Sequence, residues 1–253
     1  MKISINKRHY IGFASVVLML IIWKLLSLHF RSDFILPSPE KSLISALGIV
    51  GDIGFLKVVG ATIMRGFIGF IIAGLLGIIA GIFAGLSPNF NAFMAPFIVT
   101  VRSTPVVAFI LLALIWFTSD SVPIFIAILT MFPIVYSNVV EGINNVDGKL
   151  VEMAIFYKVN RKRIVGEVYV PAIMPFLVSG FSTAVGIGWR AIIVGEVLSQ
   201  PKYGIGTDMH AAQLFLNVEA LIAWTVIAVI FGWLFEKLIR TGESKIVVWR
   251  GKK

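Results

Sequence analysis

The chain has 253 residues, of which 58% are hydrophobic and 14% are charged. With its 23 glycines counted, about two thirds of the chain is apolar, against roughly 45–50% in soluble proteins. A soluble domain of this size could not remove so much apolar surface from water, which excludes soluble enzymes, disordered chains and disulfide scaffolds. A polytopic membrane protein remains. The chain has no cysteine, so thiolate metal sites and cysteine nucleophiles are excluded as well.

The net charge is +9, from 22 Lys and Arg residues against 13 Asp and Glu residues. In a soluble protein this excess would suggest nucleic acid. In a membrane protein it indicates cytoplasmic loops rich in Lys and Arg. We therefore expect contact with membrane lipid and no nucleic-acid partner.

Apolar segments long enough to cross a bilayer, about 20 residues each, recur along the chain. The first is interpreted as an uncleaved span, because its apolar run continues past Lys24 and no small-residue cleavage site follows. The sequence predicts a single all-α transmembrane domain with six spans, at about 10–30, 62–86, 91–117, 121–140, 171–198 and 217–239. Alternation from a cytoplasmic N-terminus places both termini and most Lys and Arg residues in the cytoplasm, in agreement with the positive-inside rule.

A further helix is expected between the first two spans. Ser38 can cap its start, and Pro39 suits the first helical position. Leu43, Leu47 and Val50 then recur at helical spacing among polar residues, which is typical of an amphipathic helix at the outer surface. A plain connecting helix is equally compatible with this pattern.

The second span carries a small residue at every fourth position. Such a stripe lets another helix approach closely. General tolerance of glycine in membrane helices does not explain the regular spacing, so we predict a helix-packing stripe. Its members are Gly69, Ala73, Gly77, Gly81 and Gly85.

The third span contains a charge beside a proline. A charge in hydrocarbon costs roughly 2.5–3.5 kcal/mol, so Arg102 is expected to face a cavity or a partner. Pro105 bends or breaks the helix, and Ser103 and Thr104 can satisfy the freed carbonyls. A broken helix beside an arginine is typical of the wall of a solute path. An arginine that extends to the inner headgroups is the equally weighted alternative.

The longest inner loop, residues 141–170, alternates apolar and charged residues. This pattern predicts short helices that stand off the membrane as a docking surface. A solvated basic loop that only sets topology is the alternative.

This loop resembles that of the inner membrane permeases of bacterial ABC importers, whose pattern is Glu-Ala-Ala, three residues, Gly, nine residues, Ile-x-Leu-Pro. Glu152, Ala154, Val168, Val170 and Pro171 match that pattern. The order and spacing of further motifs across residues 36–240 are similar to the nitrate/sulfonate/taurine branch of the family. These motifs are Leu36-Pro37-Ser38-Pro39, Arg65, Arg102-Ser103-Thr104-Pro105, Trp116-Phe117, Trp189-Arg190 with Glu196, and Gly204-Ile205-Gly206.

Two residues depart from the loop pattern. Met153 replaces the first alanine, and Lys158 stands where the family has glycine. Glycine there would allow a positive φ, which lysine cannot adopt cheaply. Either the turn moves to Asn160, which tolerates the left-handed conformation, or the fit to the ATPase differs.

The resemblance implies the type I ABC importer permease fold in a bacterial inner membrane. The partners would be a second permease subunit, expected to be another copy of this chain, two ABC ATPase subunits and an extracytoplasmic substrate-binding protein. The cargo would be a small solute, with the two arginines inside spans favouring an anion such as a sulfonate or nitrate. The same branch also resembles carriers of vitamin precursors, so such a precursor is an alternative cargo. The residues that would form the coupling helix and its flanks are Glu152, Met153, Ala154, Lys158, Asn160, Arg161, Val168 and Pro171.

Charged residues of the fifth span are expected along the path or its gate, beside Trp189. Arg190 lies deep in the span and is expected to meet the cavity or the second permease. Glu196 follows six residues later, about 600° around the helix, so the two do not share a face. Near the outer end, Glu196 could contact the binding protein or close an outer gate, and simple placement at the boundary is equally compatible.

We expect no catalytic residue, metal site or cofactor in this chain. A phosphate-binding Gly-x4-Gly-Lys-Ser/Thr loop is absent from the sequence, so ATP and Mg would be bound by the separate ATPase. A secondary transporter or channel would predict paired intramembrane carboxylates or an internal repeat, and the sequence shows neither. A membrane-embedded enzyme would need a nucleophile with a base, or a metal cluster, in the spans, and no such set occurs.

Overall fold

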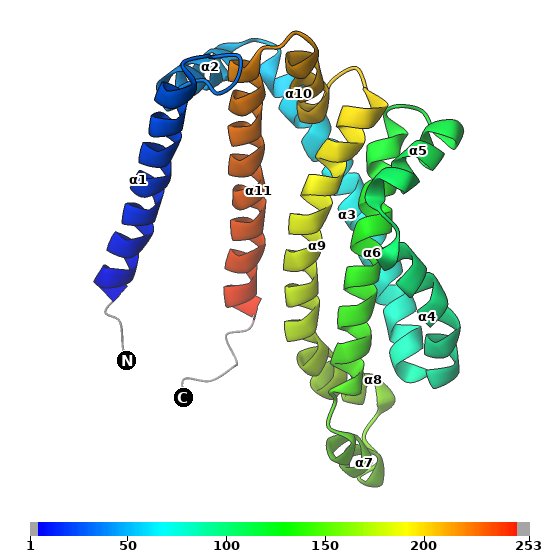
Figure 1. Cartoon of the computed structure of the whole chain (residues 1–253). Helices are drawn as coiled ribbons and strands as arrows, with labels where there is room; N and C mark the ends of the chain where they lie inside the picture. The colour runs from blue at the N-terminus through cyan, green and yellow to red at the C-terminus, as the bar shows by residue number, and fades with distance from the viewer. Residues whose placement is uncertain (1–4, 247–253) are drawn as a thin grey trace.

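The computed structural model describes residues 5–246, and this part of the chain folds into helices without β-strands (Figure 1). The predicted all-α fold is therefore confirmed. The terminal segments, for which a cytoplasmic location was expected, lie outside the described residues. The helices are α1 (Ile5–Phe30), α2 (Pro39–Gly51), α3 (Phe55–Leu86), α4 (Pro88–Ser103), α5 (Val106–Trp116), α6 (Ser121–Asn144), α7 (Gly148–Phe156), α8 (Arg161–Ile164), the π-helix Val165–Tyr169, α9 (Val170–Ser199), α10 (Ile205–Leu214) and α11 (Val218–Ile246).

Five of these helical segments are long and apolar enough to cross a membrane, and the pair α4 and α5 makes a sixth if the two count as one broken span. The axes of α4 and α5 meet at 99°, so residues 91–117 do not form the continuous span that was counted there. Pro105 is the physical cause, because it has no backbone N–H and disfavours helical geometry at Thr104, where ψ is 131°. α3 begins at Phe55, earlier than the expected start of its span at residue 62.

The core of the bundle is formed by α3, α6 and α9, whose buried apolar side chains make one continuous cluster. α3 and α6 run in the same direction, and the small-residue stripe of α3 faces α6. A Cβ built on each glycine of the stripe would lie within 2.6–2.7 Å of a Cβ on α6, so only glycine permits this approach. The facing pairs are Gly69–Ala127, Gly77–Val135, Gly81–Val139 and Gly85–Ile143, and Ala73 between them is fully buried.

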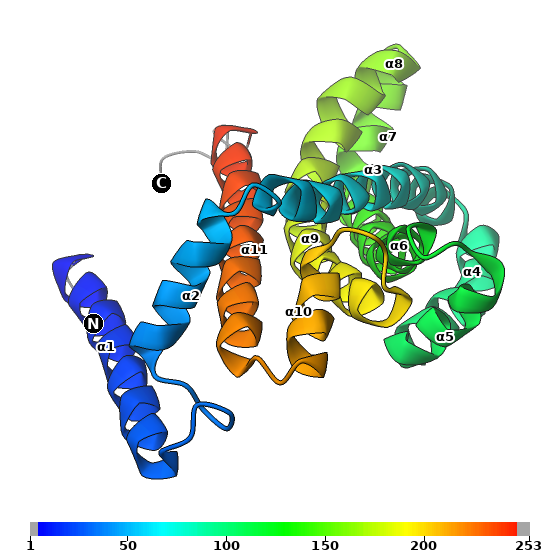
Figure 2. The ribbon, with the colours of Figure 1, turned by 90° about the horizontal axis from the view of Figure 1, so that it is seen from above.

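The short helices mark two ends of the bundle. α2 and α10 lie at one end, and α7 and α8 project from the other (Figure 1). We refer to these as the α10 end and the α7 end. α1 begins at the α7 end and α11 finishes there. Seen from the α10 end, α2 lies between α1 and α11 (Figure 2).

The expected helix after the first span is present as α2. The Ser38 side chain accepts a hydrogen bond from the backbone N–H of Lys41, and Pro39 begins the helix. Ser42 and Ala46 are buried, whereas Leu43 and Leu47, about 100° further around the helix, stay exposed. Exposed leucines suit an amphipathic helix at a membrane surface, which stays a prediction beside the plain connecting helix.

α1 stands apart from the core in both ribbon views. The apolar window of this helix is not buried by any other part of the described chain. Its attachment is to α2 and the preceding loop, through the Trp23 indole N–H on the Pro37 carbonyl (3.0 Å) and the Lys24–Glu40 ion pair (2.8 Å). The apolar surface of α1 is thus available to lipid or to another protein.

Candidate translocation and coupling sites

The loop predicted to dock a partner forms two short helices beyond the ends of α6 and α9 (Figure 1). The Asp147 side chain caps α7 by accepting from Lys149 N (2.9 Å), and Asn160 caps α8 by accepting from Lys162 N (3.0 Å). Glu152 and Met153 are exposed on α7, and Ala154 is half-buried.

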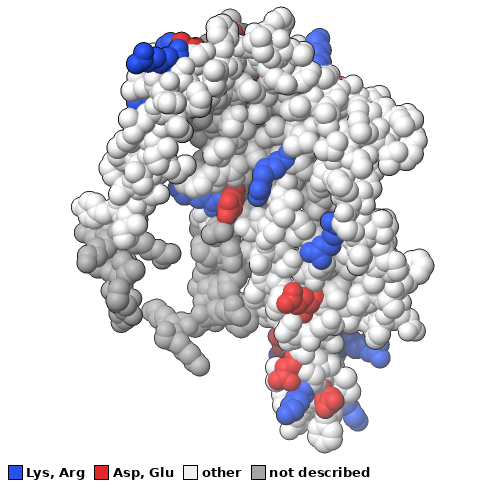
Figure 3. Space-filling model, in the orientation of Figure 1, with Lys and Arg blue, Asp and Glu red and all other residues white. Residues whose placement is uncertain are grey.

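The tip of this protrusion is apolar. Phe156 is 81% exposed, and Ile155 and Tyr157 beside it are also exposed. Charged side chains of both signs surround this tip (Figure 3). A large exposed aromatic group inside a charged rim is typical of a protein-docking surface.

The turn between α7 and α8 is built on Lys158, which has a φ of 54°. Val159 N–H donates to Ala154 O (2.9 Å) and Lys158 N–H donates to Ile155 O (2.9 Å), the two bonds of a Schellman helix end. The left-handed residue of this motif is usually glycine, and lysine there costs about 1 kcal/mol. The turn has not moved to Asn160, whose φ is −60°.

The remaining loop residues belong to the connection into α9. Val168 lies in the π-helix that joins α8 to α9, and Pro171 lies in the first turn of α9. Tyr169 is itself helical (φ −71°, ψ −52°), so the chain enters α9 without a break, and the N–H that Pro171 lacks falls next to the π-helix rather than at a free helix start. Arg161 to Ser199 thereby forms one long helical segment that joins the docking protrusion to the core.

At the break between α4 and α5, the hydroxyls of Ser103 and Thr104 bond to carbonyls one turn earlier in α4. Ser103 Oγ donates to Val99 O (2.6 Å) and Thr104 Oγ1 donates to Thr100 O (2.7 Å), which already accepts from Thr104 N (3.1 Å). The expected bonds to the carbonyl that Pro105 frees, that of Val101, are therefore not formed by these side chains. The first turn of α5 has no side-chain cap. Arg102 is exposed at the break and belongs to none of the ion pairs formed by the side chains that the structure describes.

A polar stripe runs along the exposed face of α9. Ser179, Thr183 and Arg190 lie on this face, and Arg190 Nε donates to Gly186 O (3.2 Å) in its own helix. None of the ion pairs of the described residues includes Arg190. In the view of Figure 3, a few charged side chains of both signs interrupt a mostly uncharged face of the long helices.

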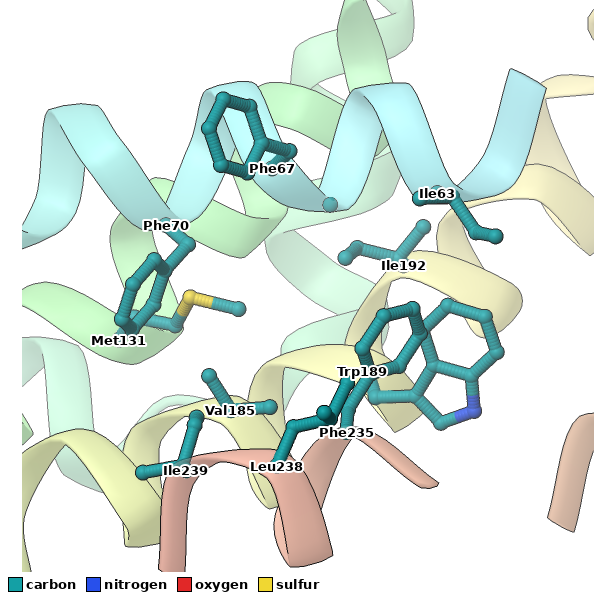
Figure 4. A pocket seen from close by; sticks show the side chains of 11 residues that line it. Ile63, Phe67, Phe70, Met131, Val185, Trp189, Ile192, Phe235, Leu238 and Ile239 are labelled. Atoms are coloured by element: carbon teal, nitrogen blue, oxygen red, sulfur yellow. The ribbon is translucent and has the colours of Figure 1, made fainter. Parts of the chain in front are cut away.

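Trp189 points away from this stripe. It is buried, donates its indole N–H to Ala228 O on α11 (2.9 Å) and packs against Phe235. It borders a cavity of about 200 Å³ between α3, α6, α9 and α11 (Figure 4). Every lining side chain of this cavity, Met131 among them, is apolar, so the cavity offers nothing to hold an anion.

A polar cluster at the α10 end joins four parts of the chain, and we call it the Arg65 cluster. Arg65 Nη1 donates to Glu196 Oε1 (2.6 Å) and to Tyr203 O (2.8 Å), and Arg65 Nη2 pairs with Asp120 Oδ1 (2.5 Å). The Arg65 side chain is 8% exposed and that of Glu196 is 0% exposed. A carboxylate buried this completely does not offer a binding protein a surface to touch, which argues against one of the three roles open to Glu196, whereas its role at an outer gate stays a prediction.

The same carboxylate also anchors the start of α10. Glu196 Oε2 accepts from Gly206 N (3.0 Å) and from Thr62 Oγ1 (3.0 Å), and Thr62 Oγ1 accepts from Ile205 N (2.9 Å). Two N–H groups that would be unsatisfied at a helix N-terminus therefore have buried partners. A negative group is also favoured at that position by the helix dipole.

The glycines around Ile205 are explained by this contact. A Cβ on Gly204 would lie 2.7 Å from Glu196 Cδ. A Cβ on Gly206 would overlap the Ile193 carbonyl oxygen and lie 2.7 Å from Glu196 Cβ. Only glycine lets the chain pass this close to α9.

The sequence identified Glu196 as a candidate but gave no role to Arg65, Thr62 or Asp120. Arg65 and Glu196 are opposite charges near the same end of two predicted spans. Because a buried charge needs a partner, the similar predicted depth of Arg65 and Glu196 in the membrane was the sequence signal that could have identified them as an ion pair. Among the described residues, no group of three His, Asp or Glu side chains could hold a metal ion.

Comparisons with known proteins show what the chain as a whole is similar to. The chain is 26% identical to the taurine transport system permease protein TauC of Escherichia coli K12, over 93% of this chain and 88% of that protein. It is 34% identical to the aliphatic sulfonates transport permease protein SsuC of the same organism, described as putative, over 90% of this chain and 87% of that protein. The bicarbonate transport system permease protein CmpB of Synechococcus elongatus is 25% identical over 70% of this chain and 69% of that protein.

A solved structure shares the fold. A chain of the MetNI methionine ABC transporter, in an inward-facing conformation, matches with a TM-score of 0.57 and 17% identity, over 79% of this chain and 95% of that chain. The predicted permease fold is thereby confirmed. The family model described as "Binding-protein-dependent transport system inner membrane component" matches residues 73–240, two thirds of the chain. The chain therefore belongs to this family of ABC importer permeases.

Proposed function

We propose that this permease conducts a small anion, of the sulfonate or nitrate type, through a path that includes the exposed face of α9. The observation that carries this proposal is Arg190, a cation on the exposed face of a spanning helix that belongs to none of the ion pairs of the described residues. A charge facing hydrocarbon is costly, so this face is expected to meet water or a second subunit. Arg102 at the α4–α5 break supplies a second cation. Two unneutralised arginines favour an anion, and the matched relatives are named for taurine, sulfonates and bicarbonate.

The surfaces that this chain leaves uncovered support a proposal for how the transporter subunits assemble. α1 exposes apolar side chains, and the exposed face of α9 combines apolar side chains with the charge of Arg190. Neither surface is suited to contact with water alone. We expect a second copy of the chain to cover part of this surface, so that the path lies between two permeases. The α7 end, with its basic residues, would face the cytoplasm, in keeping with the positive-inside rule. The termini would lie on the same side of a bacterial inner membrane.

The α7–α8 protrusion is suited to dock one ATPase subunit per permease. Its aromatic tip is exposed, and α8 continues through the π-helix into α9, so a displacement at the protrusion can reach the core helices. Two separate ATPases would bind ATP and Mg and perform the hydrolysis. The substrate-binding protein would deliver the cargo at the α10 end. Docking of the ATPases and of the binding protein changes the conformation of the permease only if their contacts are more favourable in one of its two states than in the other.

Replacing Glu152 with arginine tests the docking role. The substitution reverses a charge on the exposed surface of α7 without disturbing the core. We expect at least a tenfold loss of transport, with the ATPase either dissociated or hydrolysing ATP without transport. Co-purification of the ATPase and vesicle uptake would measure both effects. Lys202→Glu, a charge reversal at the α10 end, should keep the ATPase bound. Normal association and transport in the Glu152 variant would contradict the docking role.

Replacing Arg190 with alanine tests the anion path. A hydrogen bond to a charged group contributes about 1.5–3 kcal/mol, so we expect transport of a sulfonate to fall about 10- to 100-fold. Arg190→Lys should retain part of the rate, because the positive charge remains. Val194→Ala, one turn further along the same exposed face, serves as the matched control. Uptake by the alanine variant at the normal rate and selectivity would remove Arg190 from the path.

A further inference from the structure

The turn between α5 and α6 is fastened to the core at two points. Ser199 Oγ on α9 donates to the Ser119 carbonyl (2.9 Å), and Asp120 pairs with Arg65 on α3 (2.5 Å). The two partners of this ion pair differ greatly in exposure. The Asp120 side chain is 68% exposed, whereas that of Arg65 is 8% exposed.

This asymmetry makes Asp120 the releasable partner. Arg65 Nη1 stays bound to Glu196 and to the Tyr203 carbonyl if Asp120 leaves, so the buried guanidinium remains neutralised. Opening the pair returns the Asp120 carboxylate to water while Arg65 keeps its two other acceptors, so we expect the bond to shift the balance between its open and closed forms by about fivefold at most, as exposed pairs do. The Arg65–Asp120 bond can therefore open and close without unfolding the Arg65 cluster.

The turn determines the position of one end of α5. The other end of α5 meets α4 at the 99° break, where only Thr104 and Pro105 separate the two helices. Ile110 and Ala113 bury the middle of α5 against α6 and α9. A change at the turn is therefore transmitted along a rigid helix of 11 residues to the break that carries Arg102.

We infer that Asp120 and Arg65 form a latch, a releasable ion pair that positions α5 and with it the α4–α5 break. A basic side chain on a protein that docks at the α10 end would compete for the exposed Asp120 carboxylate and open the latch. Asp120 and Arg65 are positioning residues in this scheme, since neither needs to touch the solute. The inference rests on the proposed function, in which the binding protein docks at this end.

Asp120→Asn in the complex of permease and ATPase, reconstituted without binding protein, tests the latch. The variant removes the charge of the exposed partner only, so we expect basal ATP hydrolysis to rise about two- to fivefold at an unchanged melting temperature. Asp120→Glu should restore the low basal rate. Asp33→Asn is the matched control, because Asp33 also forms an ion pair near the α10 end, with Lys41, but that contact does not reach α5.

A second measurement reports on the break itself. The natural chain has no cysteine, so Ser103→Cys introduces a single thiol at the exposed break. We expect Asp120→Asn to change its rate of labelling by a water-soluble maleimide at least twofold, and Asp33→Asn to leave that rate unchanged. Unchanged hydrolysis and labelling in the Asp120 variant would overturn the latch. If the wild-type permease binds no ATPase, the proposed function fails instead, and the labelling rate still decides whether Asp120 positions the break.

Discussion

Arg65→Ala is expected to destabilise the protein more than the removal of any exposed charge. The Glu196 carboxylate, 0% exposed, would lose its one cationic partner among the described residues and remain buried. Removing one member of a buried ion pair costs about 3–5 kcal/mol, because the other charge stays uncompensated. For a chain of this size we expect the melting temperature in detergent to fall by about 10 °C or more.

Three further variants separate charge from packing. Arg65→Lys keeps the charge but loses the second nitrogen and should melt between the wild type and Arg65→Ala. Combining Arg65→Ala with Glu196→Gln should recover part of the loss, because the amide removes the unpaired charge and can still accept from Gly206 N. Arg102→Ala, which removes an exposed arginine, should leave the melting temperature nearly unchanged. An Arg65→Ala protein that melts within about 2 °C of the wild type would contradict this account.

The helices themselves could be predicted from the sequence because each depends on local information. A membrane span needs only a long apolar run, and the α2 start needs only Ser38 and Pro39. The break at Pro105 follows from the chemistry of one residue. Composition could not reveal that the break turns α5 by 99°, because that angle depends on how Ile110 and Ala113 pack against α6 and α9.

The Arg65 cluster could not be assembled from the sequence, because its members are far apart in the chain. Arg65 and Glu196 are separated by 131 positions, and periodicity gives a residue's face but not its partner. The same limit applies to Arg190. Its location in a span was evident from the sequence, but that its face stays open within this chain depends on the packing of the other helices.

Lys158 illustrates a different limit. Local conformational preference argued against a left-handed lysine, yet the structure places Lys158 at a φ of 54°. Two backbone hydrogen bonds at the end of α7 require that conformation, and their contribution of about 1 kcal/mol each exceeds the cost of the strain. The hydrogen bonds that a turn completes can therefore outweigh the conformational preference of the residue at that turn.

Gly206→Ala is expected to displace the start of α10 from α9. The added Cβ would overlap the Ile193 carbonyl oxygen and lie 2.9 Å from the Val197 nitrogen. Both are backbone atoms inside a helix, so neither can move aside as a flexible side chain could. Overpacking a tight contact costs about 1–3 kcal/mol. The displacement would also weaken the bond from Gly206 N–H to Glu196, so we expect a total loss of about 3 kcal/mol.

Gly60→Ala provides the matched control for this prediction. Gly60 is also a helical glycine, on α3, but a Cβ there meets nothing within 4 Å. Its replacement should leave the melting temperature unchanged or raise it, since alanine favours a helix by about 1 kcal/mol over glycine. If both variants melt like the wild type, α10 does not depend on its close approach to α9. If only Gly206→Ala loses stability, the glycine is required because α10 must lie close enough for Glu196 to accept its N-terminal N–H group.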